Sequence, residues 1–421
     1  MMINSGDTAW VLASGALVLF MTPGLSIFYG GMVRAKSALN MMMMSFAAIG
    51  VTTVIWVLYG YSLAFGPDSG HGLIGNFSQL GLSKAINQTV GASGHHIPTL
   101  AYVMFQLTFA IVTVALLSGA IADRTKYGSW VLFVGVWVTL VYIPVAHWAF
   151  ASQNGHGGWI VDRLGALDFA GGTVVEINSG AAALALAIVL GKRSGFRRDP
   201  MRPHNMPLVL LGAGMLWFGW FGFNAGSALS AGSLAATAMI NTQIATAAAA
   251  MSWVLYEKIR EGRATTLGVA SGAIAGAVAI TPACGFVTPL GALLIGLLAG
   301  PLAAFAVSRK YKWGYDDSLD VLGVHGIGGF LGMLGVGFLA TTEANKHGGL
   351  GLLYHGSFSL LGKQIVASVA TALFSFIMTF IIAKVISKTI GFRAEHDEEL
   401  MGLDTTFHAE SAYDLTGNGN R

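Results

Sequence analysis

Long stretches without a charged residue are the feature that most limits how this chain can fold. Four of them contain no Lys, Arg, Asp or Glu: residues 8–33, 37–67, 203–256 and 264–308. A helix that crosses a bilayer needs about 20 apolar residues, so the last two stretches are each long enough for two helices. Only 10% of all residues are charged, whereas soluble domains usually carry about 25%. The chain is therefore predicted to be a membrane protein.

The apolar pattern predicts an all-α membrane protein with eleven transmembrane helices. A porin-type barrel would show short alternating strands instead of these uninterrupted runs. The first apolar run lacks a preceding basic segment, so it is predicted to be a retained helix and not a cleaved signal peptide. The predicted spans are Thr8–Gly31, Ala38–Phe65, Ile97–Ala122, Ser129–Phe150, Thr173–Leu190, Leu208–Gly226, Leu234–Tyr256, Leu267–Thr281, Pro289–Ser308, Val321–Ala340 and Gln364–Ile386.

The positions of the basic residues predict how the chain is oriented. Cytoplasmic loops are enriched in Lys and Arg, and all but four of the 23 basic residues fall on one side of the predicted spans. The N-terminus is therefore expected outside and the C-terminus in the cytoplasm, which requires an odd number of spans. We expect a multi-pass protein of the cell membrane, with a transmembrane domain over 1–390 and a cytoplasmic tail over 391–421. The other side holds only Lys84, Arg163, Lys346 and Lys363.

Two similar segments indicate an internal repeat. Ala166-Leu-Asp168 precedes the fifth predicted span, and Ser318-Leu-Asp320 precedes the tenth. A repeat of five spans places an odd number of helices in each half, so the chain is predicted to contain two inverted halves plus one extra helix. Transporters often bind substrate where such halves meet. Chance similarity between two helices rich in small residues is the alternative.

Glu176 and His325 are the most informative candidate site residues. Each lies early in an apolar span, at matching places in the two candidate halves. An ionisable group inside a membrane is costly and by default marks a transport path or a proton relay. The alternative is that each makes a structural hydrogen bond to a neighbouring helix. Asp168 and Asp320 precede the same spans, and we interpret them mainly as caps of backbone N–H groups.

Aromatic residues and one serine form a weaker candidate site. Phe105 and Phe109 are four residues apart and share a helix face, as do Phe223 and Ser227. Aromatic rings attract cations through their faces, and a hydroxyl accepts hydrogen bonds. Aromatic residues in membrane helices more often simply pack or anchor at the interface.

Taken together, several motifs closely resemble the ammonium transporter family, which includes the Amt, Mep and Rh proteins. The resemblance covers nearly the whole chain. The matching stretches include Val18-Leu-Phe-Met-Thr-Pro-Gly24, Tyr142-Ile-Pro-Val-Ala-His147, Gly165-Ala-Leu-Asp-Phe-Ala-Gly-Gly-Thr-Val-Val175, Gly219-Trp-Phe-Gly-Phe-Asn-Ala-Gly-Ser227, Thr281-Pro-Ala-Cys-Gly285 and Asp320-Val-Leu-Gly-Val-His-Gly326.

The resemblance implies a homotrimer with one pore in each subunit, carrying ammonium or ammonia, with methylammonium as a further candidate substrate. It implies that Ser227 and Phe109 bind ammonium in an outer vestibule and that Phe109 and Phe223 form a stacked gate. Trp220 would line the pore, and His325 would be its second histidine. Asp168 would stabilise the vestibule. The favoured mechanism removes a proton from NH4+ near the gate and conducts NH3 and the proton separately.

Two positions depart from the family pattern. Glu176 replaces the first pore histidine, which resembles some fungal Mep proteins and a subset of microbial ones. Phe150 stands where the family usually has a tryptophan, and phenylalanine is the weaker cation–π partner. We therefore expect Trp148 to share the binding of the cation with Phe150.

The remaining expectations concern partners and rival functions. The tail segment Gly402–Tyr413 resembles the family's cytoplasmic segment, which can contact a PII signalling protein. The rivals are a passive NH3 or CO2 channel and an ammonium sensor acting through PII. The single cysteine, Cys284, excludes a multi-cysteine metal site. We expect contact with membrane lipid, but no metal, cofactor, nucleic-acid partner or enzymatic activity.

Overall fold

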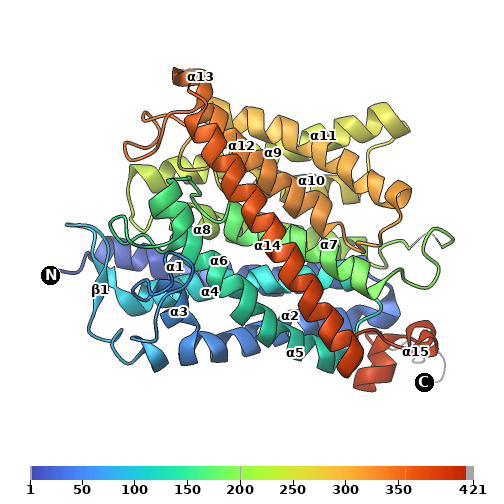
Figure 1. The fold of residues 1–421 in the computed structure, drawn as a ribbon. Coiled ribbons are helices and arrows are strands. Elements are labelled where there is room, and N and C mark those ends of the chain that lie inside the picture. Colours follow the sequence, from blue (N-terminus) through green and yellow to red (C-terminus); the bar gives the residue numbers. More distant parts are fainter. Residues whose placement is uncertain (1, 200, 356, 414–421) are drawn as a thin grey trace, which may run out of the picture.

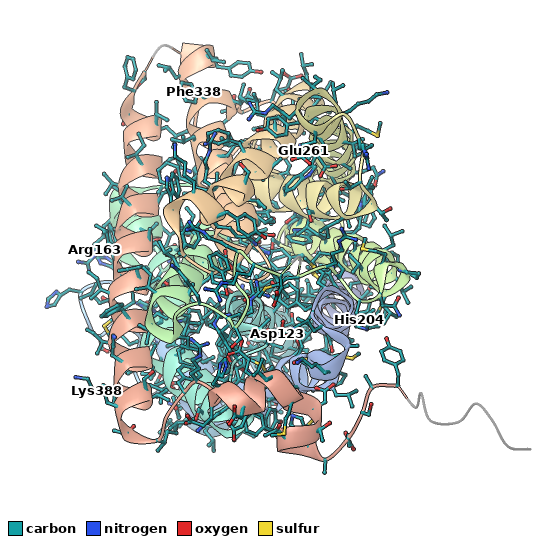
Figure 2. The ribbon with its side chains drawn as sticks, turned by 90° about the vertical axis from the view of Figure 1, so that its right-hand side faces the viewer. Asp123, Arg163, His204, Glu261, Phe338 and Lys388 are labelled. Atoms are coloured by element: carbon teal, nitrogen blue, oxygen red, sulfur yellow. The ribbon has the colours of Figure 1, made fainter. Side chains whose placement is uncertain are left out.

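The computed structural model describes residues 2–199, 201–355 and 357–413, which form a bundle of long helices and one small two-stranded sheet. In Figure 1 the sheet strand β1 and the terminal helix α15 lie at opposite ends of this bundle. We call these two ends the β1 end and the α15 end. Figure 2 looks onto the α15 end, with Asp123 near its centre and Lys388 at its edge.

The secondary structure is almost entirely helical. The α-helices are α1 Ser5–Met32, α2 Ala38–Ile55, α3 Tyr61–Phe65, α4 Thr99–Leu117, α5 Tyr127–Trp137, α6 Ile143–Phe150, α7 Asn178–Leu190, α8 Met206–Gly226, α9 Ser233–Glu261, α10 Thr266–Ile280, α11 Pro289–Trp313, α12 Ile327–Leu339, α13 Leu352–His355, α14 Ser359–Thr389 and α15 His396–Met401. Short 3-10 or π segments are η1 Ala35–Ser37, η2 Trp56–Gly60, η3 Leu80–Leu82, η4 Ser118–Ile121, η5 Val138–Tyr142, η6 Trp159–Leu164, η7 Gly172–Ile177, η8 Leu322–Gly326 and η9 Asp404–His408. Strands β1 Thr89–Val90 and β2 Ile97–Pro98 pair antiparallel.

Among the residues that the structure describes, ten helical segments are long and apolar enough to cross a membrane, and each overlaps a predicted span. Their outward faces carry exposed apolar side chains such as Met251, Leu298 and Leu373, as contact with lipid requires. The segments are Ser5–Met32, Ala35–Phe65, Thr99–Ile121, Tyr127–Phe150, Gly172–Leu190, Met206–Gly226, Ser233–Glu261, Pro289–Trp313, Leu322–Leu339 and Ser359–Thr389.

The remaining predicted span, Leu267–Thr281, corresponds to the shorter helix α10. Its 15 residues rise only about 22 Å at 1.5 Å per residue, less than the roughly 30 Å of a hydrocarbon core. The helix packs against α8, α9, α11 and α12, and the buried turn at residues 281–287 continues from its end. An eleventh crossing therefore stays a prediction, as do the orientation and the trimer.

Candidate functional site

Two cavities follow one another along α4. The first, which we call the vestibule cavity, is lined by α4 residues from Tyr102 to Phe109, near β2, and the second, the pore cavity, by Val112 and Leu116 farther along this helix. The vestibule cavity is lined by Tyr102, Phe105, Gln106, Phe109, Phe150, Phe169, Ser227 and Leu229. The pore cavity is lined by Met21, Leu25, Phe28, Tyr29, Val112, Leu116, Val175, Glu176, Leu216, Trp220, Phe223, Ile274 and His325.

A pair of phenylalanine rings separates the two cavities. Phe109 of α4 lines the vestibule cavity and Phe223 of α8 lines the pore cavity. Their ring centroids are 4.2 Å apart with an interplanar angle of 34°, and both residues are buried. Phe105 packs edge-on against Phe109 at 4.8 Å. The two rings therefore lie in contact where the linings of the two cavities meet.

Glu176 and His325 meet inside the pore cavity. The His325 Nδ1 and Glu176 Oε2 atoms are 2.7 Å apart, within hydrogen-bonding distance, and both residues are buried. The second carboxylate oxygen, Oε1, has no hydrogen-bond partner among the described residues. The two ionisable groups, 149 residues apart in the chain, thus form one dyad with an acceptor oxygen left over.

Glycines at the crossing of two helices bring this dyad together. Glu176 lies on η7, which continues into α7, and His325 lies on η8, which continues into α12. A Cβ added to Gly180 would lie 2.3 Å from the Gly326 Cα, and one added to Gly329 would lie 2.7 Å from the Glu176 Cβ. Because no side chain stands between the backbones, the two helices approach closely enough for a direct contact.

Aspartates cap the two helices that carry the dyad, but one of them is not the predicted residue. Asp168 accepts hydrogen bonds from the amides of Gly171, Gly172 and Thr173 at 2.6–2.8 Å. At the second helix the Leu322 amide donates to Asp317 at 2.7 Å.

Asp320 therefore does not have the capping role predicted for it. Its backbone has a φ of 66°, and its carboxylate pairs with the Lys310 ammonium. His325 follows Asp317 by the same number of residues as Glu176 follows Asp168. The position in the second half that matches Asp168 is therefore Asp317.

The remaining predicted residues divide between the cavities, with one exception. Ser227 and Phe150 line the vestibule cavity, and Trp220 lines the pore cavity and donates to Thr281 Oγ1 at 2.9 Å. Trp148 reaches neither cavity. Its indole donates to the Leu73 carbonyl at 2.9 Å and its ring packs on Phe374. The expected contact of Trp148 with substrate is thus wrong in this structure, because the helix turns its side chain away from the vestibule.

Gln106 is a vestibule residue that the sequence reasoning missed. Its Nε2 donates to the Tyr102 hydroxyl at 3.2 Å, while its Oε1 is buried with no hydrogen-bond partner among the described residues. A lone amide between Phe105 and Phe109, inside a charge-free apolar run, was the signal that could have found it.

Comparison with known proteins decides the family. Residues 9–413 match the family described as the Ammonium Transporter Family. A Mycobacterium tuberculosis protein named ammonium transporter is 53% identical over 434 residues, which cover 98% of this chain and 91% of that protein. This chain belongs to the ammonium transporter family.

Solved structures of two ammonium transporter family proteins resemble this fold. The crystal structure of Candida albicans Mep2 has a TM-score of 0.86 at 33% identity and covers 94% of this chain and 88% of that one. A structure named Sensor Amt Protein has a TM-score of 0.85 at 29% identity, with 95% and 98% covered. This chain is accordingly a multi-pass membrane protein and a transporter, not an enzyme.

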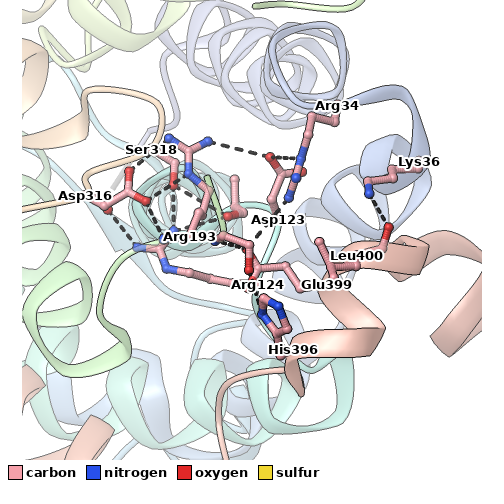
Figure 3. Close-up of polar contacts among 12 residues, drawn as sticks. Arg34, Lys36, Asp123, Arg124, Arg193, Asp316, Ser318, His396, Glu399 and Leu400 are labelled. Carbon is pink, nitrogen blue, oxygen red and sulfur yellow. Dashed lines mark hydrogen bonds and ion pairs between the residues drawn. The ribbon is translucent and has the colours of Figure 1, made fainter. Parts of the chain in front are cut away.

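The tail that follows α14, which includes α15, is held against the rest of the bundle by buried charged side chains (Figure 3). The Glu399 carboxylate of α15 is fully buried, accepts from the Ser194 amide at 2.6 Å and pairs with Arg393 at 2.9 Å. One of its oxygens also lies 3.8 Å from Arg34. Farther along the tail, Asp404 accepts from the Asn40 amide at 2.8 Å.

A neighbouring cluster fixes the loops on which the tail rests. Arg193 makes two side-chain bonds to Asp316, at 2.9 and 3.0 Å, and Arg124 donates to Ser318 at 2.6 Å (Figure 3). Burial opposes ionisation of Asp316. The hydrogen bond and charge of Arg193, with the charge of Arg124, outweigh burial and hold the pKa of Asp316 below its usual value. These buried contacts of Arg193 and Arg124 form a surface at the α15 end, which we call the ionic platform.

Removing the buried carboxylate of this tail is expected to loosen it. Glu399→Ala removes the partner of Arg393 and the acceptor of the Ser194 amide. Because Arg393 is 35% exposed and Arg34 keeps its pair with Asp123, the expected loss is about 1–3 kcal/mol, the cost of leaving a buried hydrogen-bonding group without its partner. We expect a lower unfolding temperature and faster proteolysis after α14. Glu399→Gln, which keeps an acceptor for the Ser194 amide, should lie between this variant and the wild type. Equal unfolding temperatures and cleavage rates in all three proteins would contradict the anchoring role.

Proposed function

We propose that this transporter recruits NH4+ in the vestibule cavity, removes a proton near the phenylalanine pair and passes NH3 through the pore cavity. The proton travels separately through Glu176 and His325. The observation that carries this proposal is a buried apolar cavity, closed by two rings, in which a carboxylate and an imidazole share a hydrogen bond at 2.7 Å. A permanent ion in such surroundings costs several kcal/mol, whereas neutral ammonia does not carry that cost. Potassium has no proton to give up, so the pore rejects it.

Recruitment in the vestibule rests on the chemistry of its lining. The faces of Phe109 and Phe150 attract a cation, with the two rings at right angles and 6.5 Å apart. The Ser227 hydroxyl donates its proton to the Phe223 carbonyl at 2.8 Å, so its oxygen lone pairs remain available as acceptors. Gln106 Oε1 adds a second acceptor. Two oxygen acceptors between aromatic rings suit a small cation that donates hydrogen bonds.

The dyad supplies the proton path. Glu176 can hold a proton that it shares with His325, and its free Oε1 can accept one arriving from the vestibule side. Such a relay moves charge without a water-filled channel wide enough for hydrated ions. In this proposal Asp168 holds the start of η7, and hence Glu176, in place through its backbone bonds.

The assembly proposed for this transporter is a homotrimer with the β1 end outside and the α15 end in the cytoplasm. The distribution of Lys and Arg supports this orientation. A PII protein is the proposed partner at the α15 end, where the tail is packed on the ionic platform. The likeness to a sensor protein of the same fold favours sensing through this tail as the second candidate function.

Ammonium-induced current tests the proposal directly. The purified protein on a supported membrane should give a current with ammonium and none with potassium. Ammonia uptake without current would instead identify a passive gas channel. Absence of both, with ammonium-dependent binding of a PII protein, would identify a sensor.

Replacing Gln106 is expected to weaken ammonium binding in the vestibule. Gln106→Leu removes an acceptor of a charge-assisted hydrogen bond, so the half-saturating ammonium concentration should rise about tenfold, or roughly 1.4 kcal/mol. Tyr102→Phe is the matched control, because it removes the other partner of Gln106 and leaves Oε1 in place. The measurement is the current across a range of ammonium concentrations. Equal half-saturating concentrations in the two variants would contradict this role of Gln106.

A further inference from the structure

The first turn of α1 contains a carboxylate that joins three separate segments at the β1 end. Asp7 is only 4% exposed. Its Oδ1 accepts from the Ala231 amide at 2.7 Å, and its Oδ2 lies 2.8 Å from the His95 Nδ1. Its own amide donates to the Asn4 side chain at 3.0 Å, which caps the helix. A buried carboxylate with this many partners holds its neighbours in one arrangement.

One turn farther along, α1 contacts the same region a second time. The Trp10 indole donates to the Ala225 carbonyl at 3.1 Å. Ala225 stands in the last turn of α8, where its carbonyl also accepts from the Ala228 amide of the following turn at 3.3 Å. Below it, a Cβ added to Gly226 would lie 2.5 Å from the Ser14 Cβ and 2.9 Å from Phe105. The end of α8 is therefore pressed directly against α1 and α4.

The segment held in this way carries vestibule residues. Ser227 is the C-cap of α8, and both Ser227 and Leu229 line the vestibule cavity. Leu229 has a φ of 53°, a left-handed conformation that is sterically unfavourable for a leucine. Its amide donates to the Gly226 carbonyl at 2.9 Å. A turn in this conformation needs outside contacts, and Asp7 and Trp10 provide one on each side of it.

We propose that Asp7 and Trp10 are positioning residues of the ammonium site. They set the 225–231 turn so that the Ser227 hydroxyl faces the vestibule cavity, without contacting ammonium themselves. This inference rests on the proposed recruitment at Ser227. It assigns to α1 a role in substrate affinity, in addition to lining the pore cavity through Met21 and Leu25.

Concentration-dependent currents of Asp7 variants test this role. Asp7→Ala removes the acceptor for the Ala231 amide, and the half-saturating ammonium concentration should rise about fivefold, the factor expected for one net hydrogen bond. The maximal current per folded protein should stay near the wild-type value. Asp7→Asn retains an Oδ1 acceptor and should restore most of the affinity. His95→Ala leaves the Ala231 contact intact and should have little effect.

A cycle with Ser227→Ala distinguishes positioning from general damage. If Asp7 acts through the Ser227 turn, Asp7→Ala should have little further effect once the hydroxyl is gone. Additive losses, or a fall in maximal current with unchanged half-saturation, would overturn the inference. If Asp7→Ala does not accumulate in membranes, Trp10→Phe tests the second support of the turn. It keeps an aromatic ring, although a smaller one, and removes the N–H that donates to the Ala225 carbonyl, and unchanged affinity there would also overturn the inference. A wild-type protein without ammonium current would refute the proposed function instead.

Discussion

Replacing Glu176 with leucine is expected to reduce ammonium-induced current at least about tenfold, which corresponds to a barrier increase of about 1.4 kcal/mol. The substitution leaves His325 without the carboxylate that lies 2.7 Å from its Nδ1. The pore cavity then has no pair of groups that can pass a proton between them. Neutral ammonia can still enter, but each molecule that crosses leaves its proton behind, so net transport of ammonium stops. Current measured against pH on a supported membrane provides the readout.

Two further substitutions separate the relay from mere packing at this position. Glu176→Gln keeps the volume and a hydrogen bond to His325 but cannot exchange a proton, so it should be as inactive as the leucine variant. Glu176→His restores the commoner family arrangement. It should keep the current and shift its pH dependence, because the deprotonated dyad no longer brings a negative charge into the pore. Wild-type currents with unmoved pH profiles in all three variants would make Glu176 merely structural.

Removal of the Phe223 ring is expected to abolish selective transport. Phe223 and Phe109 are the two contacting rings between the vestibule and pore cavities, with centroids 4.2 Å apart and their planes tilted by 34°. Phe223→Ala opens this partition and leaves a cavity, at a stability cost of about 3–5 kcal/mol for a buried phenylalanine. We expect ammonium current to disappear or to lose its selectivity against potassium, while the protein still assembles.

Phe46→Ala is the matched control for the gate variant. Phe46 lies on α2 and is 55% exposed, so its removal leaves both cavities intact and should preserve selective current. The two variants are compared by current in ammonium and in potassium, and by size-exclusion chromatography of the purified proteins. Full, selective transport by Phe223→Ala would remove the gate from the proposed mechanism.

The membrane helices were largely predictable, since their signal is local. A segment that crosses a bilayer must bury nearly every residue in an apolar medium and satisfy its backbone internally, so length and lack of charge suffice to find it. The span predicted at Leu267–Thr281 agrees with helix α10 to within one residue at each end. Composition does not reveal the buried turn that follows this helix at residues 281–287.

Site residues were predictable where an ionisable side chain in an apolar span has a high free-energy cost. They were not predictable where the orientation of a side chain decides whether it lines a cavity. Glu176 and His325 are ionisable groups in apolar runs, and each carries that cost in the sequence itself, whereas the uncharged amide of Gln106 was missed. Trp148 and Phe150 lie only two residues apart, yet the first packs against Phe374 and the second lines the vestibule. Which of two neighbouring aromatic rings faces a cavity depends on the rotation of the helix, which its neighbours determine.

By itself, the sequence determined the membrane class, the family and the presence of a carboxylate and an imidazole inside the bundle. Only the tertiary structure decided that these groups share a hydrogen bond, that Asp317 and not Asp320 caps the second helix, and that Asp7 supports a turn 224 residues away. The physical reason is one of range. Transfer from water to lipid acts on each residue separately, whereas a hydrogen bond of 2.7 Å requires two backbones to approach closely, and here the Gly180–Gly326 crossing allows that approach.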